Sequence, residues 1–326
     1  MNFCDKYYNK ALKFFHLLTD AEYEVREGLL AMGDSGVEAF LTGRFAKKPP
    51  RIVVHIHLYY VDQWPELAKC LLNIPANWRK TFVTLVEENE AVRAEILKTD
   101  PNATILLVEN KGFDVGPFIE VVNRLDLDQY DYMVKLHSKR DIPNGTWSRG
   151  QNLSGSRWRE YLLSFIKTQS AFFRTLACFE LSQRVGMVGD ERCLITKEKM
   201  LFEEFFSTPP LAWLDRSRMR REYISGTMFM VRADLLKIFQ HKVSLDDFAV
   251  TIRDENTLAH AFELSFGFMI SMQGKELLGT GLCRKRTIFI SWFKTKIVRF
   301  FYQSGVTRSR HRYIKICRIP VYRKKV

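Results

Sequence analysis

The feature that most constrains the fold is a regular alternation of apolar and amphipathic runs between residues 51 and 140. The apolar, β-branched runs read RIVVHIHLYY, KTFVTLV, ATILLVEN and YDYMVKLH, and helix-like runs such as LAKCLLN, AVRAEILKT and FIEVVNRL separate them. Strands that alternate with helices predict βαβ units, hence a parallel sheet with helices on both faces. The expected fold class is therefore α/β, with an open and mainly parallel sheet.

Composition excludes several other classes of protein. Apolar residues make up 46% of the chain and charged residues 27%, as in an ordinary globular protein. The longest run without Asp, Glu, Lys or Arg extends over eleven residues, from Leu264 to Gly274. A membrane-spanning helix needs about twenty apolar residues, so we expect none. The six cysteines are scattered without a CxxC pair, which argues against zinc and favours a reduced cytosolic chain.

Charge separates the end of the chain from the rest. Residues 277–326 contain 14 Lys and Arg and no Asp or Glu, so the rest holds 36 basic and 37 acidic residues. We therefore expect a basic, aromatic C-terminal tail (277–326) after a nearly neutral body, in which the break KKPP (47–50) separates an N-terminal helical segment (1–48) from an α/β domain (49–276). Within the α/β domain a single helix is expected over residues 158–181. A neutral body argues against a nucleic-acid partner, which would need a basic patch on it.

The tail has the pattern of an amphipathic helix. At helical spacing Phe289, Phe293, Ile297 and Phe300 share one face, with basic residues largely opposite. A basic helix with aromatic anchors suits an anionic membrane surface, which we predict as a partner through residues 284–326. The predicted location is cytoplasmic, peripheral on the inner face of the cytoplasmic membrane. The alternative is a helix that packs its apolar stripe on the domain.

Ligands of open α/β sheets bind beyond the carboxyl ends of the strands. The third apolar run leads into a loop with Asn110, Gly112, Asp114 and Gly116. The glycines permit left-handed backbone and close approach of a ligand, and the polar side chains could hold a ribose or hydroxyl group. The first N–H groups of the helix that follows could attract a phosphate. An ordinary Asn/Gly turn is the alternative.

The fourth apolar run ends in KLHSKRD, which presents His137, Lys139 and Arg140 at the mouth of the sheet. Lysine neutralises phosphates, although the same residues could form a solvated basic turn. His57 lies near the end of the first run and is a further binding candidate. His55 is interpreted as a structural histidine, because no third ligand accompanies the pair at the spacing of a metal site.

Residues 226–260 supply candidates for the side of the crevice that faces an acceptor. Asp254 and Glu255 precede an expected helix, and either carboxylate could remove a proton from an acceptor hydroxyl. Acidic residues at a helix start also complement its dipole, which is the plainer interpretation. Gly226 and Thr227 could allow a tight backbone approach or simply begin a strand. His260 is placed on the same side.

Six stretches together carry a family resemblance: VHIHLYYVDQWPEL, VENKGFDVGPFI, YDYMVKLHSKRD, VGMVGDE, SGTMFMVRADLL and DENTLAHAFELSFG. Through them residues 51–270 resemble the rhamnan synthesis protein F family of bacterial glycosyltransferases. The resemblance implies a nucleotide-diphospho-sugar transferase sheet of the GT-A type. It also implies transfer of rhamnose or a similar sugar from a nucleotide-sugar donor to a growing cell-surface polysaccharide or lipid-linked glycan.

The resemblance also implies roles for single residues. Nucleotide-sugar binding is expected of one set: His57, Asn110, Gly112, Asp114, Gly116, Lys135 and Lys139. Catalysis is expected of Glu255, Asp254 and His137, and acceptor-side contacts of Gly226, Thr227 and His260. A non-catalytic, membrane-surface component of a polysaccharide assembly complex is the alternative function.

One departure from the usual transferase pattern concerns the metal. An Asp-x-Asp metal motif usually follows the fourth strand, but His137-Ser138-Lys139 stands there, and Asp126 and Asp128 lie before the strand. No metal ligand is therefore predicted, and a Mg or Mn ion stays an open alternative. Our hypothesis is that His137 and Lys139 partly replace the metal opposite the leaving diphosphate.

Overall fold

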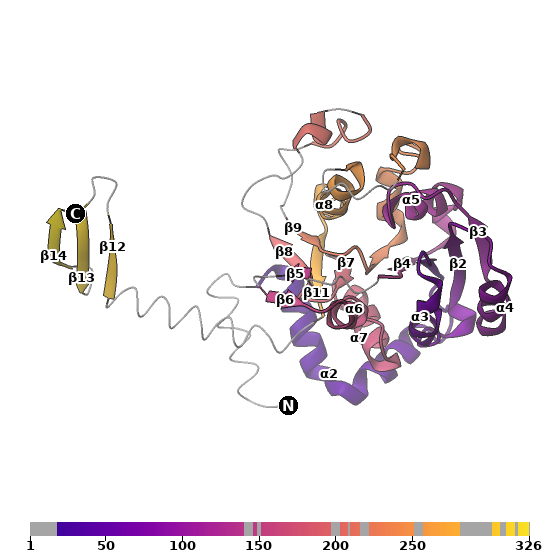
Figure 1. The fold of residues 1–326 in the computed structure, drawn as a ribbon. Helices are drawn as coiled ribbons and strands as arrows, with labels where there is room; N and C mark the ends of the chain where they lie inside the picture. The colour runs from indigo at the N-terminus through magenta and orange to yellow at the C-terminus, as the bar shows by residue number, and fades with distance from the viewer. Residues whose placement is uncertain are drawn as a thin grey trace.

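A computed structural model describes residues 18–139, 146–148, 151–196, 203–207, 209–215, 222–250, 257–280, 302–306, 311–316 and 319–325. Its centre is an α/β body with the order of elements shown in Figure 1. The helices and strands are α2 (Asp20–Arg44), β1 (Ile52–His57), α3 (Trp64–Leu71), β2 (Arg79–Leu85), α4 (Glu90–Thr99), β3 (Thr104–Leu107), α5 (Val115–Arg124), β4 (Tyr132–His137), β5 (Thr146–Ser148), β6 (Gln151–Leu153), α6 (Gly155–Leu163), α7 (Gln169–Leu181), β7 (Val185–Gly189), β8 (Leu194–Thr196), β9 (Glu222–Ile224), β10 (Phe229–Arg232), α8 (Leu258–Met272), β11 (Glu276–Gly279), β12 (Tyr302–Val306), β13 (His311–Ile316) and β14 (Ile319–Lys325).

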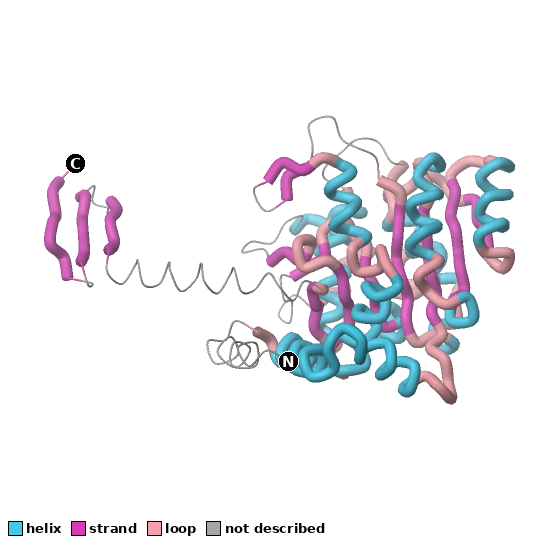
Figure 2. The backbone as a smooth tube through the Cα atoms, turned by 90° about the horizontal axis from the view of Figure 1, so that it is seen from below, coloured by secondary structure: helices cyan, strands magenta, loops and turns pink. Residues whose placement is uncertain are grey.

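The main sheet has seven strands in the order β3-β2-β1-β4-β10-β7-β11. β1 pairs in parallel with β2 and β4, β2 with β3, and β7 with β11, while β10 runs antiparallel between β4 and β7. Helices α5 and α8 pack together on one face of the sheet, and α3, α4 and α7 cover the other (Figures 1 and 2). The predicted fold class, an open and mainly parallel α/β sheet with helices on both faces, is confirmed.

The four strands expected between residues 51 and 140 form, and the two central ones, β1 and β4, are buried on both faces. All six residues of β1 and all six of β4 are buried. A central parallel strand lies between two helix layers, so a nearly continuous apolar run fits it better than alternation. Local signals mark the helix starts: Pro65 occupies the first turn of α3, and the Asn89 side chain caps α4 by accepting the Val92 N–H at 3.0 Å.

The N-terminal helix belongs to the same core. In α2 the apolar side chains Val25, Leu29, Val37 and Leu41 are buried within the main cluster, and the helix packs on α7. Residues 20–44 thus add a layer to the α/β body rather than forming a unit of their own. The first 17 residues of the predicted segment lie outside the described residues.

Two expected boundaries differ in the structure. The helix expected over residues 158–181 is two helices, α6 and α7, because buried Phe165 and Ile166 pass between them and Thr168 caps α7 through the Ala171 N–H at 3.1 Å. The expected domain end at residue 276 falls inside β11, which pairs with β7 up to Gly279. The body therefore reaches into the predicted tail.

The C-terminal part forms a separate antiparallel sheet in the order β12-β13-β14. The amphipathic helix predicted over residues 285–300 lies outside the described residues. Of the helices that the structure describes, none combines the length and apolar character that crossing a bilayer requires.

Packing around α8 gives a direct test of the core. Phe262 is fully buried and its ring centroid lies 5.9 Å from that of Phe239, 5.9 Å from that of Phe248 and 5.5 Å from that of Phe266. We expect Phe262→Ala to lower the free energy of unfolding by about 3–5 kcal/mol, from lost burial and a cavity. Urea denaturation measures it. The control Leu97→Ala, at a side chain 37% exposed, should cost no more than about 0.5 kcal/mol; equal losses would contradict the assignment.

Candidate functional site

The carboxyl ends of β1 and β4 bring a band of polar side chains to one face of the sheet. In the parallel pair His55 lies opposite Lys135 and His57 opposite His137. The Thr84 hydroxyl of β2 is 3.0 Å from both His55 Nε2 and His57 Nδ1. Alternate positions of a strand share a face, so these five side chains cross three strands side by side.

Lys135 is the buried centre of this band. Its side chain has no exposed surface, and its ammonium donates to the Asp114 carboxylate, to the Thr227 hydroxyl at 2.9 Å and to the Thr227 carbonyl at 3.1 Å. These bonds use all three ammonium protons and leave none for a ligand. Burial lowers the pKa of Lys135, and the Asp114 charge opposes that shift. The structure therefore places this predicted binding residue beneath the crevice, where it holds Asp114 and Thr227.

Asp114 is held on one side and open on the other. Its Oδ2 accepts hydrogen bonds from Lys135 and from the Thr227 hydroxyl, whereas Oδ1 accepts none from a described residue, and the side chain is 19% exposed. Burial opposes ionisation, but the neighbouring His137 and Lys135 and the two hydrogen bonds outweigh it and hold the pKa of Asp114 well below its usual range. Asp114 thus offers the crevice one oxygen of a permanently ionised carboxylate.

The two histidines at the strand ends are neutral at pH 7. Burial lowers the pKa of His57 to about 3 and that of His137 to about 4, although the Asp114 charge acts in the opposite direction. His137 Nε2 donates to the Gly226 carbonyl at 2.8 Å. His57 Nε2 makes no hydrogen bond to any described residue. The Nδ1 of His137 lies 3.1 Å from the Ser138 carbonyl oxygen, so neither ring nitrogen of this residue is left for a diphosphate. His57, which is 3% exposed, keeps its Nε2 without a partner among the described residues.

Two tight turns meet at Asp114. Gly112 and Phe113 form one, with φ of 68° and 54°, and Gly226 and Thr227 form the other, with φ of 82° and 52°. Glycine adopts this left-handed region freely, whereas a residue with a Cβ is strained there by about 1–3 kcal/mol. The hydrogen bonds that Thr227 makes to Lys135 and Asp114 offset this strain and fix the second turn against the first.

Lys139 stands at the mouth of the band with its backbone clamped. Gln63 accepts the Lys139 N–H at 2.7 Å and donates to its carbonyl at 2.9 Å, and Arg159 donates to the same carbonyl at 2.8 Å. The side chain is partly exposed, and its charge lowers the pKa of Lys135 and His137. A cation in this place is suited to an anionic ligand over the strand ends.

Sequence comparison identifies the family. The family described as rhamnan synthesis protein F matches residues 20–206, more than half of the chain. The chain belongs to the rhamnan synthesis protein F family. The matched part of this family member runs from α2 to the 3-10 helix Glu203–Ser207 and includes β1, β4 and the turn at Gly112. The resemblance found in the sequence is thereby confirmed.

Other relatives are distant. Two curated proteins from strains of Xanthomonas campestris pv. campestris, both called Uncharacterized protein WxcX, are 22% identical over 230 residues. The aligned part is 69% of this chain and 32% of theirs, so the chain spans about a third of their length. Among solved structures, the mannosyltransferase PcManGT from Pyrobaculum calidifontis, in complex with GDP-Man and Mn2+, matches with a TM-score of 0.35 and 14% identity over 78% of this chain and 65% of that one. A likeness at this level says nothing about the function of this family member.

The loop before α5 contributes its shape more than its polar groups. Asn110 is partly exposed and makes no hydrogen bond to a described residue. A Cβ at Gly116 would lie 2.2 Å from the Lys111 carbonyl oxygen, so only glycine fits. The N–H groups of Val115 and Gly116 already donate to the Gly112 carbonyl, at 3.0 and 3.1 Å. The expectation that the first amides of this helix hold a phosphate is therefore not met.

The acceptor-side candidates are only partly described. Asp254 and Glu255 lie outside the described residues, so their assignment as bases stays a prediction. His260 lies on α8 next to the turn that Gly112 and Phe113 form. Its ring centroid is 5.4 Å from that of Phe113, and its Nδ1 is 2.7 Å from the Thr257 hydroxyl oxygen. Gly226 and Thr227 form the turn before β10 and reach the band through the Gly226 carbonyl, the Thr227 carbonyl and the Thr227 hydroxyl; their role on the acceptor side stays a prediction.

Sequence reasoning missed two residues at the site. Glu263 of α8 accepts the Gly226 N–H at 2.7 Å through Oε1, and Gln63 holds Lys139 as described above. Glu263 follows His260 at helical spacing, and Gln63 lies within the stretch VDQWPEL. Their positions in the sequence were the only hint of a role. Neither stretch of sequence shows which distant part of the chain the side chain contacts.

The described residues do not gather a metal centre. No group of three or more His, Cys, Asp or Glu side chains within the described ranges is arranged to hold an ion. At the end of β4, where two carboxylates are usual, stand neutral His137, Ser138 and the cation Lys139. These three side chains include no carboxylate and one cation, so by themselves they do not fit a divalent ion.

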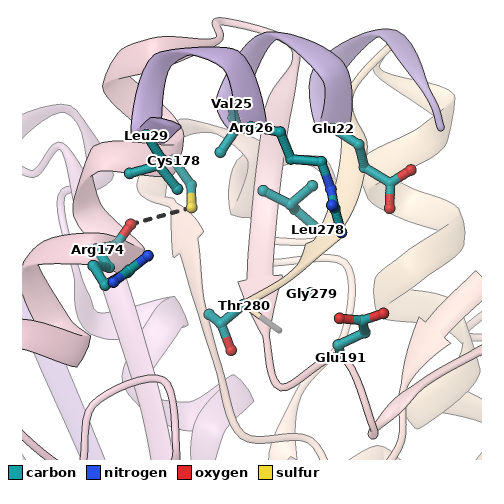
Figure 3. A pocket seen from close by; sticks show the side chains of 10 residues that line it. All are labelled: Glu22, Val25, Arg26, Leu29, Arg174, Cys178, Glu191, Leu278, Gly279 and Thr280. Carbon is teal, nitrogen blue, oxygen red and sulfur yellow. Dashed lines mark hydrogen bonds between the residues drawn. The ribbon is translucent and has the colours of Figure 1, made fainter. Parts of the chain in front are cut away.

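A small cavity elsewhere in the body is unrelated to the site. It lies beneath α2, between α7 and β11, and is lined by charged and apolar side chains (Figure 3). Cys178 points into it, donating its thiol hydrogen to the Arg174 carbonyl at 3.2 Å. Burial raises the pKa of Cys178 to about 12. The thiol is therefore unreactive, and this cavity offers no nucleophile.

Removing the buried cation tests the arrangement. Lys135→Met deletes the partner of Asp114 and of both Thr227 oxygens, and we expect the free energy of unfolding to fall by about 3 kcal/mol, because a largely buried carboxylate is left without its counter-ion. Adding Asp114→Asn should restore part of the loss. Urea denaturation of the two single variants and the double variant measures the coupling; additive losses would show that Lys135 and Asp114 do not act together.

Proposed function

We propose that this chain is a glycosyltransferase that moves rhamnose or a similar sugar from a nucleotide-diphosphate donor to a growing cell-surface polysaccharide or lipid-linked glycan. The observation that carries the proposal is the band of polar side chains at the ends of β1 and β4, where Asp114 keeps one carboxylate oxygen without a partner among the described residues and the cation Lys139 follows His137. Membership of the rhamnan synthesis protein F family supports the polysaccharide class.

The charge of the crevice supports an anionic donor. Lys135 and Asp114 neutralise each other, and both strand-end histidines are uncharged at pH 7. Lys139 therefore supplies the positive charge at this end of the sheet, close to the carboxylate of Glu263. In the proposed reaction the bond from the sugar to the diphosphate breaks and negative charge develops on the leaving oxygen. A fixed cation close to that charge lowers the barrier.

The remaining groups suit recognition of sugar and nucleotide hydroxyls. Asp114 Oδ1 can accept hydrogen bonds from hydroxyls, and His57 Nε2 can accept or donate according to its tautomer. We place the nucleotide or ribose near His57 and Asp114, the diphosphate near Lys139, and the acceptor near the turn at residues 226–227. An in-line attack by the acceptor hydroxyl would invert the anomeric centre.

The basic C-terminal tail supports a proposal about where in the cell the protein acts. Residues 277–326 hold 14 basic and no acidic residues, and each basic residue near an anionic leaflet contributes roughly 1 kcal/mol. We propose that residues 284–326 bind an anionic membrane surface, on the cytoplasmic face of the cytoplasmic membrane, where a lipid-linked acceptor would be present.

A donor screen tests the function. With the full chain and deoxythymidine-diphospho-rhamnose as the first ligand, we expect a rise in melting temperature, since a ligand at 100 times its Kd adds roughly 2.7 kcal/mol to stability. Lys139→Gln should weaken donor binding about tenfold, by removing a charge-assisted contact. Lys98→Gln, at a side chain 76% exposed on α4, is the matched control and should bind as the wild type does.

The alternative function predicts a different outcome. A non-catalytic membrane-surface component would bind anionic vesicles but no nucleotide sugar, and Asp114→Asn would leave its binding intact. On the proposed function, Asp114→Asn abolishes sugar transfer. Vesicle binding by a chain that binds no nucleotide sugar would therefore reject the transferase.

Removal of divalent metal tests how the diphosphate is stabilised. The cationic end of β4 leads us to expect that transfer persists in excess chelator, with a rate within about twofold of that in Mg2+, since Lys139 supplies a fixed positive charge there. Complete loss of activity that Mg2+ or Mn2+ restores would contradict this expectation and would show that an ion is required.

A further inference from the structure

Glu263 presents a carboxylate oxygen to the crevice that nothing in the described structure holds. Its Oε1 accepts the Gly226 N–H at 2.7 Å, but Oε2 accepts no hydrogen bond from a described residue. The side chain is partly exposed. Glu263 projects from α8, which packs on β9, β7 and β11, so a regular helix sets its position.

The same turn holds a second carboxylate. Gly226 binds Glu263 through its N–H, and the next residue, Thr227, binds Asp114 through its hydroxyl. Each carboxylate thus has one oxygen fixed by adjacent residues of one turn and one oxygen open. The two groups lie close enough that the charge of Asp114 raises the pKa of Glu263.

The two carboxylates differ in their surroundings. Asp114 faces the ammonium of Lys135 and stays ionised. Burial and the charge of Asp114 raise the pKa of Glu263, and burial is the larger cause. The Gly226 N–H, the charge of Lys139 and His260 lower it. Tyr223 of β9 also faces Glu263. Two carboxyl groups whose environments drive their pKa values apart are suited to different roles, one as a fixed charge and one as a proton carrier.

We propose that Glu263 is the general base that removes the proton of the attacking acceptor hydroxyl, with Asp114 as a fixed ligand of the donor. This inference rests on the glycosyltransferase function proposed above. The acceptor oxygen forms a bond to the anomeric carbon, and the bond from that carbon to the diphosphate oxygen breaks with its electron pair on the diphosphate. The hydroxyl proton passes to Glu263 Oε2 and then to water. The products are a glycoside, a nucleoside diphosphate and a proton.

Glu263→Gln is the decisive variant. The glutamine amide can still accept the Gly226 N–H through its oxygen but cannot take a proton. We expect kcat to fall about 100-fold or more, with the donor Kd, measured by calorimetry on the full chain, within about twofold of wild type. The acidic limb of the wild-type kcat–pH profile should be absent from the residual activity. A purely structural role would weaken donor binding or stability without removing that limb.

Two sets of comparison variants make the result specific. Glu180→Gln removes another largely buried carboxylate, bonded to Tyr132 and Arg44 at the opposite end of the sheet, and should leave kcat unchanged. Asp254→Asn and Glu255→Gln test the bases expected from the sequence. If either of these removes the acidic limb while Glu263→Gln keeps it, the inference is overturned.

Other outcomes distinguish a failure of the proposed role of Glu263 from a failure of the proposed glycosyltransferase function. A wild-type chain that binds and transfers no nucleotide sugar rejects the proposed function, and this inference with it. Normal kcat in Glu263→Gln rejects the inference alone. Should Glu263→Gln fail to fold, Lys139→Gln serves instead: losing that cation should move the acidic limb of kcat to higher pH, and a limb that stays in place or moves down overturns the proposal.

Discussion

The buried contact between Lys135 and Asp114 is the constraint on which the crevice depends. An ammonium without exposed surface costs several kcal/mol to desolvate, and it is tolerated only when it is paired and fully hydrogen-bonded. Its partners come from two other parts of the chain, the start of α5 and the turn before β10. One side chain on the central strand therefore ties together three segments that are far apart in the sequence.

This contact also sets the electrostatics of the open surface above it. Lys135 keeps Asp114 ionised, and Asp114 keeps Lys135 charged despite its burial. The pair is neutral as a whole, so the charge that reaches a ligand comes from groups at its edge. Lys139 provides the positive charge, and the open oxygens of Asp114 and Glu263 provide acceptors of different basicity. A crevice with a cation on one side and two unlike carboxylates on the other can separate leaving-group stabilisation from proton removal.

Local pattern accounts for the parts of this arrangement that sequence could predict. β1 and β4 are apolar runs of sufficient length, and each ends in polar residues, so the parallel sheet and the polar character of its carboxyl end followed from the pattern alone. The glycines before α5 were recognised for the same reason. Lys135 was expected to bind ligand through the family resemblance, which does not distinguish it from His137 and Lys139. It lies two residues before the end of β4, and there its side chain is enclosed by neighbouring segments.

The rest depends on strand order, which no short pattern encodes. β10 enters the sheet antiparallel between β4 and β7, with Phe229 opposite Lys135, and this register brings the turn at residues 226–227 onto the end of β4. α8 packs on the sheet next to this turn and positions Glu263 against it, although Glu263 lies 37 residues after Gly226 in the chain. A glutamate within an apolar helix looks in sequence like a solvent-facing residue. Only the packing of α8 beside β9 shows that its carboxylate accepts the Gly226 N–H and leaves its other oxygen without a partner among the described residues.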